Sequence, residues 1–237
     1  MNSMLQLEKI RFTKDKEALC VFPNDLDELE RGLLMMGIQN RPVIVLIGGH
    51  ILPEHDAVHR RALEVIARTA EEIDAVIICG GTDVGVMAMI GEMRASQRSK
   101  FPLVGIAPEN LVTWPGGPQD IQPALPEGKR APLQPHHSHF VLVPGNEFGD
   151  ESPWIVRAAT FIAGDRHRAI TILANGGEVS KKDIKLALAA DRPVIVLKGT
   201  GRLADEIAHQ PRRSSLLKIV RAEDKVGLVK SILALLR

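Results

Sequence analysis

RPVIVLIGG, residues 41–49, is an uninterrupted apolar run that ends in two glycines. The same pattern returns in five further runs: AVIICGG (75–81), LVGIAP (103–108), HFVLVPG (139–145), AITILANGG (169–177) and PVIVLKGTG (193–201). None of the six alternates apolar with polar residues, which is typical of parallel strands covered by helices on both faces. The sequence therefore predicts an α/β fold: a Rossmann-like, doubly wound, mostly parallel sheet with helices on both faces.

The segments between these runs have the periodicity of helices. Residues 56–72 and 83–95 each place apolar side chains on one stripe, so we predict two crossover helices there. Ser180 and Asp183 form a capping-box pattern that predicts the start of another helix. A closing helix is predicted from the spacing of Val226, Val229, Ile232, Leu233 and Leu236.

The first 40 residues and the proline-rich middle of the chain stand apart from this rhythm. A strand is predicted around Ala18–Phe22 and a helix from Asp25 to Met36. We expect residues 1–40 to form a lead-in layer packed on a main nucleotide-binding domain of residues 41–237. Residues 109–136 are rich in proline and glycine, and we expect a lid or binding loop there.

Composition limits the partners. Thirty Lys+Arg against 29 Asp+Glu leave a net charge of +1, so no global field attracts nucleic acid or anionic lipid. Aromatic residues make up only 3% and tyrosine is absent, which removes the stacking surfaces that single-stranded nucleic-acid binders use. We expect no nucleic-acid partner and, without an apolar stretch of roughly 20 residues, no membrane partner. The start lacks a signal-peptide pattern, so we expect a cytoplasmic protein; a homo-oligomer is left open.

Glycines follow almost every predicted strand. These are Gly48, Gly49, Gly80, Gly81, Gly176 and Gly177, together with the turn Gly199, Thr200 and Gly201, while Pro108 and Glu109 follow the third run. The carboxyl ends of parallel strands share one edge, where glycine lets backbone N–H groups approach an anion at the start of a helix. A single glycine pair would indicate only a tight turn, but four turns on one edge favour a phosphate site.

Three residues beside these glycines are candidates for the same site. Thr82 has a hydroxyl that binds phosphate or, equally well, caps the following helix. Gly85 allows close approach of a ligand or a strand. Arg202 directly follows Gly201, where a guanidinium clamps a diphosphate; the competing interpretation is an exposed ion pair with Asp205.

The histidines do not predict a metal site. His137 and His139 would share a face of a strand, and we expect them to hydrogen-bond a ligand or backbone. No Cys, Asp or Glu lies nearby at ligand spacing, so metal binding is the weaker alternative. His55 and His59 have chelating spacing, but a solvated helix face explains them as well.

Catalysis has no diagnostic motif in this chain. The carboxylates near the glycine edge are Glu109, Glu151, Glu178 and Asp205. There is no G-x-S-x-G, no P-loop lysine pattern and no G-x-G-x-x-G after the first strand, so the common hydrolase, kinase and dehydrogenase interpretations lack support.

Several pieces together resemble the prokaryotic LSDAT family. They are VLIGG (45–49), ICGGTDVGVMAMIGEMR (78–94), VGIAPENLV (104–112), HSHFVLVPGNEFGDE (137–151), LANGGEVS (173–180) and KGTGRLADEIA (198–208). The family belongs to the SLOG superfamily, which also holds the LOG phosphoribohydrolases, and is similar to the cytoplasmic N-terminal region of melastatin-type TRP channels. The resemblance covers roughly residues 42–208.

The resemblance implies a site for ADP-ribose or a related nucleotide, NAD-derived or AMP-like, with no further cofactor required. By analogy, Gly80–Thr82 and Gly85 would meet phosphate, Arg202 would clamp it and Phe148 would stack on the ligand. LOG enzymes carry P-G-G-x-G-T-x-x-E, and here the matching stretch reads NGGEVSKKD, in which Glu178 or Asp183 would replace the glutamate. We therefore expect ligand sensing ahead of N-glycosidic hydrolysis, for which Glu178 or Glu151 would be the catalytic group.

Overall fold

The computed structural model describes residues 5–117, 130–210 and 214–237. Within these ranges nine strands form one sheet in the order β1-β2-β8-β5-β4-β3-β9-β10-β11, and two short strands form a second sheet. The strands are β1 (Glu8–Thr13), β2 (Lys16–Val21), β3 (Val43–Gly48), β4 (Val76–Cys79), β5 (Leu103–Pro108), β6 (Val112–Thr113), β7 (Ala131–Pro132), β8 (His139–Val143), β9 (Ala169–Ala174), β10 (Val194–Lys198) and β11 (Leu217–Arg221). All six apolar runs are strands, which confirms the predicted Rossmann-like sheet.

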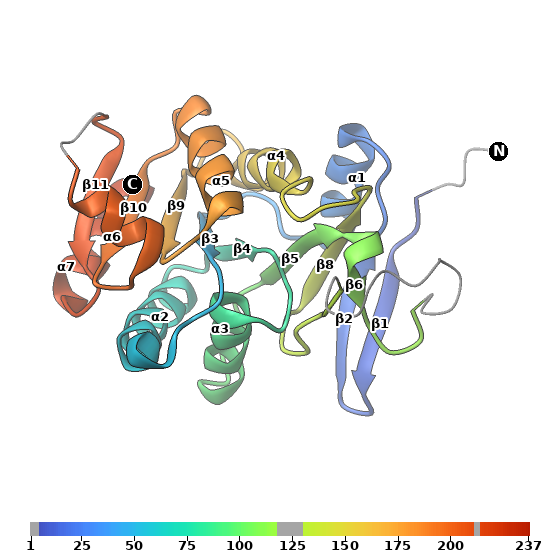
Figure 1. Ribbon diagram of the computed structural model, residues 1–237. Coiled ribbons are helices and arrows are strands. Elements are labelled where there is room, and N and C mark those ends of the chain that lie inside the picture. Colours follow the sequence, from blue (N-terminus) through green and yellow to red (C-terminus); the bar gives the residue numbers. More distant parts are fainter. Residues whose placement is uncertain (1–4, 118–129, 211–213) are drawn as a thin grey trace.

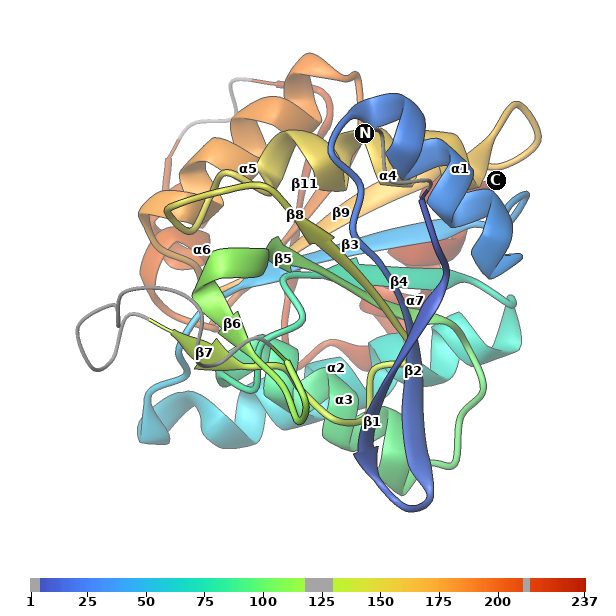
Figure 2. The same ribbon diagram turned by 90° about the vertical axis from the view of Figure 1, so that its right-hand side faces the viewer.

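Helices cover the sheet from both sides (Figures 1 and 2). They are α1 (Leu26–Met36), α2 (Asp56–Glu72), α3 (Gly85–Ser96), α4 (Ser152–Ala163), α5 (Glu178–Ala189), α6 (Arg202–Ala208) and α7 (Lys225–Leu236), with the 3-10 turns η1 (Pro53–His55) and η2 (Glu109–Leu111). Helices α2, α3 and α7 enclose one apolar core with alternate strand residues such as Ile44 and Leu46. Val43, Val45 and Ile47 point to the other core, against α1, α4 and α5. Each strand is therefore buried on both faces, which explains its unbroken apolar run.

The order of the strands contains a topological switch point. Strands β3, β4, β5 and β8 follow one another across the sheet in one direction, whereas β9, β10 and β11 continue from the other side of β3. All of these strands pair in parallel. The connections after β3 and β9 consequently leave toward opposite faces, and a crevice outside their carboxyl ends is where open α/β sheets bind ligands.

Residues 5–40 are built into the main sheet rather than forming a separate layer. Strand β2 pairs in parallel with β8, and β1 pairs antiparallel with β2 as the edge strand. Figure 2 shows this hairpin at one end of the sheet, with α1 beside α4. The predicted strand and helix are present, but the lead-in layer is corrected to an extension of the sheet.

The predicted start of one helix is wrong. Helix α5 begins at Glu178 after Gly177, so Ser180 lies inside its first turn, where its hydroxyl accepts a hydrogen bond from the Gly177 amide at 3.3 Å. Asp183 is therefore not part of a cap. The predicted closing helix is present as α7, in which Val226 is 63% exposed and Leu228 is buried.

Much of the predicted proline-rich lid, residues 118–129, lies outside the described residues. Its described ends form η2 and the parallel pair β6 and β7, and Leu133 bridges to Thr82. None of the helices in the described ranges is long and apolar enough to cross a membrane.

Candidate functional site

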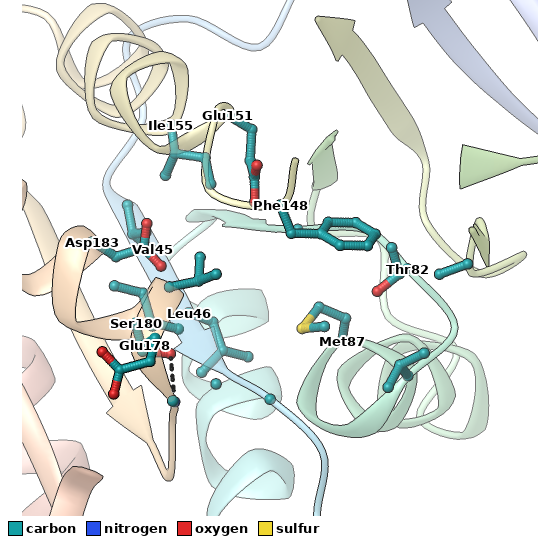
Figure 3. A pocket seen from close by; sticks show the side chains of 18 of the residues that line it. Val45, Leu46, Thr82, Met87, Phe148, Glu151, Ile155, Glu178, Ser180 and Asp183 are labelled. Atoms are coloured by element: carbon teal, nitrogen blue, oxygen red, sulfur yellow. Dashed lines mark hydrogen bonds between the residues drawn. The ribbon is translucent and has the colours of Figure 1, made fainter. Parts of the chain in front are cut away.

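A cavity of about 390 Å³ lies at the switch point, outside the carboxyl ends of β3, β4 and β9. Its floor is the end of β3, and its walls are the starts of α3, α4 and α5 (Figure 3). Its volume falls in the range of roughly 300–1,000 Å³ that is typical of small-molecule sites. The first turn of a helix leaves its N–H groups without helical partners, so these starts favour negative charge.

About half of the predicted ligand residues line this cavity. They are Gly48, Gly49, Gly80, Thr82, Phe148, Gly177, Glu178 and Arg202, and the catalytic candidate Glu151 lines it as well. Sequence reasoning missed its apolar wall, which consists of Val84, Met87, Ile155 and Val179. Phe148 is 40% exposed, and its ring lies between Glu151 on one side and Thr82 and Met87 on the other (Figure 3).

The two glycine amides of the Gly199–Gly201 turn are already bound within the turn and are not free for a ligand. The Asp205 carboxylate accepts hydrogen bonds from the Gly199 amide at 2.6 Å and the Gly201 amide at 3.0 Å. The Thr200 hydroxyl donates to the Leu197 carbonyl and accepts from the Asn175 amide. The predicted phosphate contacts of this turn are thus corrected: its role is to hold the start of α6.

Asn175 has the same effect on two other predicted amide donors. Its side-chain oxygen accepts from the Gly49 amide at 2.8 Å and from the Gly176 amide. Its side-chain nitrogen donates to the His50 carbonyl at 3.1 Å and lies 3.2 Å from His59 Nε2. This fully buried residue, which the sequence analysis overlooked, fixes the turns after β3 and β9 to each other.

Close backbone packing holds the turn after β4 in place. Gly85 has φ +53°, and a Cβ there would stand 2.0 Å from the Gly49 carbonyl oxygen. The adjacent Val86 amide donates to that same oxygen. Gly81 packs against Gly105 and does not reach the cavity. Thr82 is not the helix cap, because Val84 occupies that position without a side-chain bond; the hydroxyl of Thr82 remains a cavity-lining group.

The predicted histidines and the end of β5 lie away from the cavity. His139 begins β8 at the amino edge of the sheet, and neither His137 nor His139 lines the cavity. His137 is buried, 3.1 Å from the Cys79 sulfur, and burial lowers its pKa to about 3. Glu109 lies in η2 near Glu8 of β1 instead, where burial raises its pKa, and Pro108 is buried before it.

His55 and His59 do not form a metal site. His59 is buried; its Nδ1 lies 2.8 Å from the His55 carbonyl, and its Nε2 faces the Asn175 amide. Burial lowers the pKa of His59, which keeps its ring neutral and able to accept that bond. Across the described part of the chain, no three His, Cys, Asp or Glu side chains cluster so as to hold a metal ion.

Arg202 is the cationic group of the cavity. An added Cβ on Gly49 would lie 3.3 Å from Arg202 Nη1 and one on Gly177 2.7 Å from Nη2, so the guanidinium rests over two glycines. No described side chain forms an ion pair with it, since Asp205 is engaged with backbone amides instead. Its donors therefore face the cavity free of a carboxylate.

The acidic pole of the cavity consists of Glu151, which is buried, and Asp183, which is half-buried. Burial raises the pKa of Glu151 to about 7 and that of Asp183 to about 6, and the Asp183 charge contributes to the increase at Glu151. The Gly149 amide donates to Glu151 at 2.6 Å. Both groups line the cavity (Figure 3). Glu178 differs, because its side chain is 86% exposed and paired with Lys181.

The position of Asp183 corrects one detail of the motif comparison. Counting from Asn175, the stretch NGGEVSKKD places Asp183 ninth, which is the place of the glutamate in P-G-G-x-G-T-x-x-E. Ser180 likewise takes the place of the threonine. Asp183 is therefore aligned with the acidic residue of that motif, whereas Glu178 is not.

A parallel sheet wrapped by helices, with a cavity at its switch point, defines the Rossmann-like class of α/β proteins. The chain belongs to the LSDAT_prok family, described as "SLOG in TRPM, prokaryote", whose model matches residues 41–233. This finding confirms the resemblance seen in the sequence.

Curated relatives are ion channels of far greater length. Transient receptor potential cation channel subfamily M member 2 is 26% identical over 180 residues in Mus musculus and 27% in Rattus norvegicus. Each alignment covers 64% of this chain and only 12% of the channel.

Solved structures support the fold. The X-ray structure of TM1055 has a TM-score of 0.53 at 20% identity, covering 80% of this chain and 99% of its own. The molybdenum cofactor binding protein from the phototrophic bacterium Rippkaea orientalis has a TM-score of 0.53 at 19% identity, with 81% and 98% covered.

Proposed function

We propose that this protein binds a nucleotide-derived, phosphate-bearing small molecule of the ADP-ribose type and acts as a ligand sensor. The observation that carries the proposal is the Arg202 guanidinium, which rests over Gly49 and Gly177 at the switch point without a carboxylate partner. Arg202 is exposed at the cavity, and a guanidinium without a carboxylate partner is suited to bind a diphosphate in bidentate fashion.

The remaining wall of the cavity suits a sugar and base. Phe148, Val84 and Met87 give a base an aromatic and aliphatic surface. Membership of the LSDAT_prok family supports the same ligand class, as does the description of a protein of this fold as binding a molybdenum cofactor. Only some predicted amides remain available for phosphate, so Arg202 and the starts of α3 and α5 have the main role.

Calorimetry tests the proposal with ADP-ribose, NAD, AMP and cyclic nucleotides. We expect binding of at least one of them, weakened about 10- to 150-fold by Arg202→Ala, since a charge-assisted hydrogen bond contributes roughly 1.5–3 kcal/mol. Arg61→Ala, an exposed arginine on α2, is the matched control and should bind normally. If no nucleotide binds at millimolar concentration, or if Arg202→Ala binds as tightly as the unchanged protein, the proposal fails.

The second candidate is hydrolysis of an N-glycosidic bond. Glu151 favours it, because a carboxyl group with a pKa of about 7 is partly protonated at neutral pH and can donate a proton to a leaving base. Release of ribose 5-phosphate from AMP, abolished by Glu151→Gln or Asp183→Asn and unaffected by Glu178→Gln, would establish it. If the nucleotide binds and is still intact after prolonged incubation with the protein, ligand sensing is the function that remains.

A further inference from the structure

A second, smaller cavity lies at the opposite edge of the sheet, where α4 ends and β9 and β10 begin. Its volume is about 190 Å³, below the roughly 300–1,000 Å³ of sites for drug-sized molecules. The polar side chains that line it belong to Thr160, His167, Arg168, Asp191 and Arg192. A cavity of this size suits a compact ion rather than a whole nucleotide.

Arg192 is the buried member of this group, with only 4% of its surface exposed. Its Nη2 donates to the Val156 carbonyl at 2.9 Å and to the Thr160 hydroxyl at 3.0 Å. Its Nη1 is buried and has no hydrogen-bond partner among the described residues. An unpaired buried donor costs about 1–3 kcal/mol, and more when it is charged, so an acceptor is missing from this position.

Of the side chains that the structure describes, no buried acidic one beside Arg192 supplies the missing acceptor. Burial lowers the pKa of Arg192 to about 10, and no neighbouring carboxylate opposes this shift. Asp191 is the acidic side chain of the lining and is exposed to solvent, whereas Arg168 adds a second cation and His167 a further donor. Two guanidinium groups therefore share one small cavity without a buried counter-ion.

We propose that this cavity is a binding site for a compact oxyanion, either phosphate or a small carboxylate, with Arg192 and Arg168 as its cationic ligands. The site is distinct from the switch-point cavity, since it lies where the parallel strands begin rather than where they end. Bound anion would accept from the free Nη1 of Arg192 and neutralise the buried guanidinium, so it would stabilise the folded chain by mass action.

Thermal unfolding with inorganic phosphate or acetate, against chloride at constant ionic strength, tests this inference. We expect a saturable rise of Tm with at least one of the two probes. Arg168→Ala, a change at an exposed position, should weaken the apparent affinity about tenfold, as the loss of one charge-assisted hydrogen bond implies. Arg192→Met should abolish the response, while Arg61→Ala, an exposed arginine on α2 that borders neither cavity, should leave it unchanged. NMR of the same titration should shift the Gly164 amide and the His167 ring, which border the cavity.

The inference is overturned if neither anion raises Tm, or if the rise is the same in Arg168→Ala as in the unchanged chain. A rise that disappears only in Arg202→Ala also overturns it, because the anion then binds at the switch point. Should Arg192→Met not fold, Arg168→Ala and the NMR shifts decide. Loss of nucleotide binding alone would contradict the proposed function and leave this site standing.

Discussion

Replacing Asn175 should remove the hydrogen bonds that connect the turns after β3 and β9 beside the switch-point cavity. The Asn175 side chain makes four polar contacts, two through its oxygen to the Gly49 and Gly176 amides and two through its nitrogen to the His50 carbonyl and His59. A buried polar group that loses its hydrogen-bond partner costs about 1–3 kcal/mol. The Gly49 amide is an exception, because it borders the cavity and can bind water instead. The contacts with the Gly176 amide and with His59 are the buried ones, so Asn175→Gly should lose about 2–6 kcal/mol of unfolding free energy, twice the cost of one unsatisfied partner.

The backbone of Asn175 supplies an internal control for this experiment. Its φ is +67°, a left-handed conformation that asparagine and glycine tolerate better than alanine. Asn175→Ala should consequently lose about 1–2 kcal/mol more than Asn175→Gly. Urea unfolding followed by circular dichroism at pH 7.5 measures both values. If Asn175→Gly loses less than about 1 kcal/mol, the amide does not hold the turns together and the reasoning is refuted.

Three further predictions follow from burial and backbone geometry. Glu151→Gln should raise the unfolding free energy by about 1–3 kcal/mol at pH 8 and change it little near pH 4.5. The reason is that the pKa of Glu151 is raised to about 7 in the folded protein, so the folded protein is destabilised as pH rises from about 4.5 through 7. Urea titrations at both pH values check this. Gly85→Ala should lower the free energy of unfolding by at least about 3 kcal/mol, since its Cβ would stand 2.0 Å from a backbone oxygen. Gly37→Ala, with a similar φ and open space around it, should lower it by only about 1 kcal/mol. Equal losses in chemical unfolding would contradict the clash. Burial lowers the pKa of His137 to about 3 and of His139 to about 4. The contribution of these neutral rings to the free energy of unfolding is therefore complete above about pH 6.5 and declines as pH falls toward 4. His137→Gln should flatten that decline in acid unfolding curves, and an unchanged slope would contradict the prediction.

The strands that sequence analysis identified are those buried on both faces. Strands β1 (EKIRFT) and β11 (LKIVR) were missed, and both lie at the edges of the sheet. Edge strands carry charged residues that limit pairing with other chains, and here Lys9, Arg11, Lys218 and Arg221 interrupt the apolar run. Their signal therefore resembles that of a polar loop, so a pattern based on continuous apolar runs cannot detect them.

The candidate site was predictable in its location but not in its hydrogen bonds. The carboxyl-edge glycines indicated the right edge because strand polarity follows from the order of strand and turn. The same rule places His137, which precedes its strand, at the opposite edge, so that correction was available from the sequence. The capture of glycine amides by Asn175 and Asp205, and the burial of Glu151, depend on neighbouring turns, and only the folded chain brings these together.

The two poles of the switch-point cavity constrain each other. Arg202 and the helix starts attract negative charge, while the buried Glu151 and the half-buried Asp183 would repel it if both were ionised. Near neutral pH the raised pKa values keep part of this pair protonated, which lowers that repulsion and supplies hydroxyl donors. A ligand that satisfies both poles must therefore carry an anionic end for Arg202 and, at a distance from it, uncharged polar groups for the carboxyl pair. A free inorganic anion meets only the first requirement, whereas a phosphorylated sugar meets both, and on the proposed function this difference would favour a nucleotide over a simple anion.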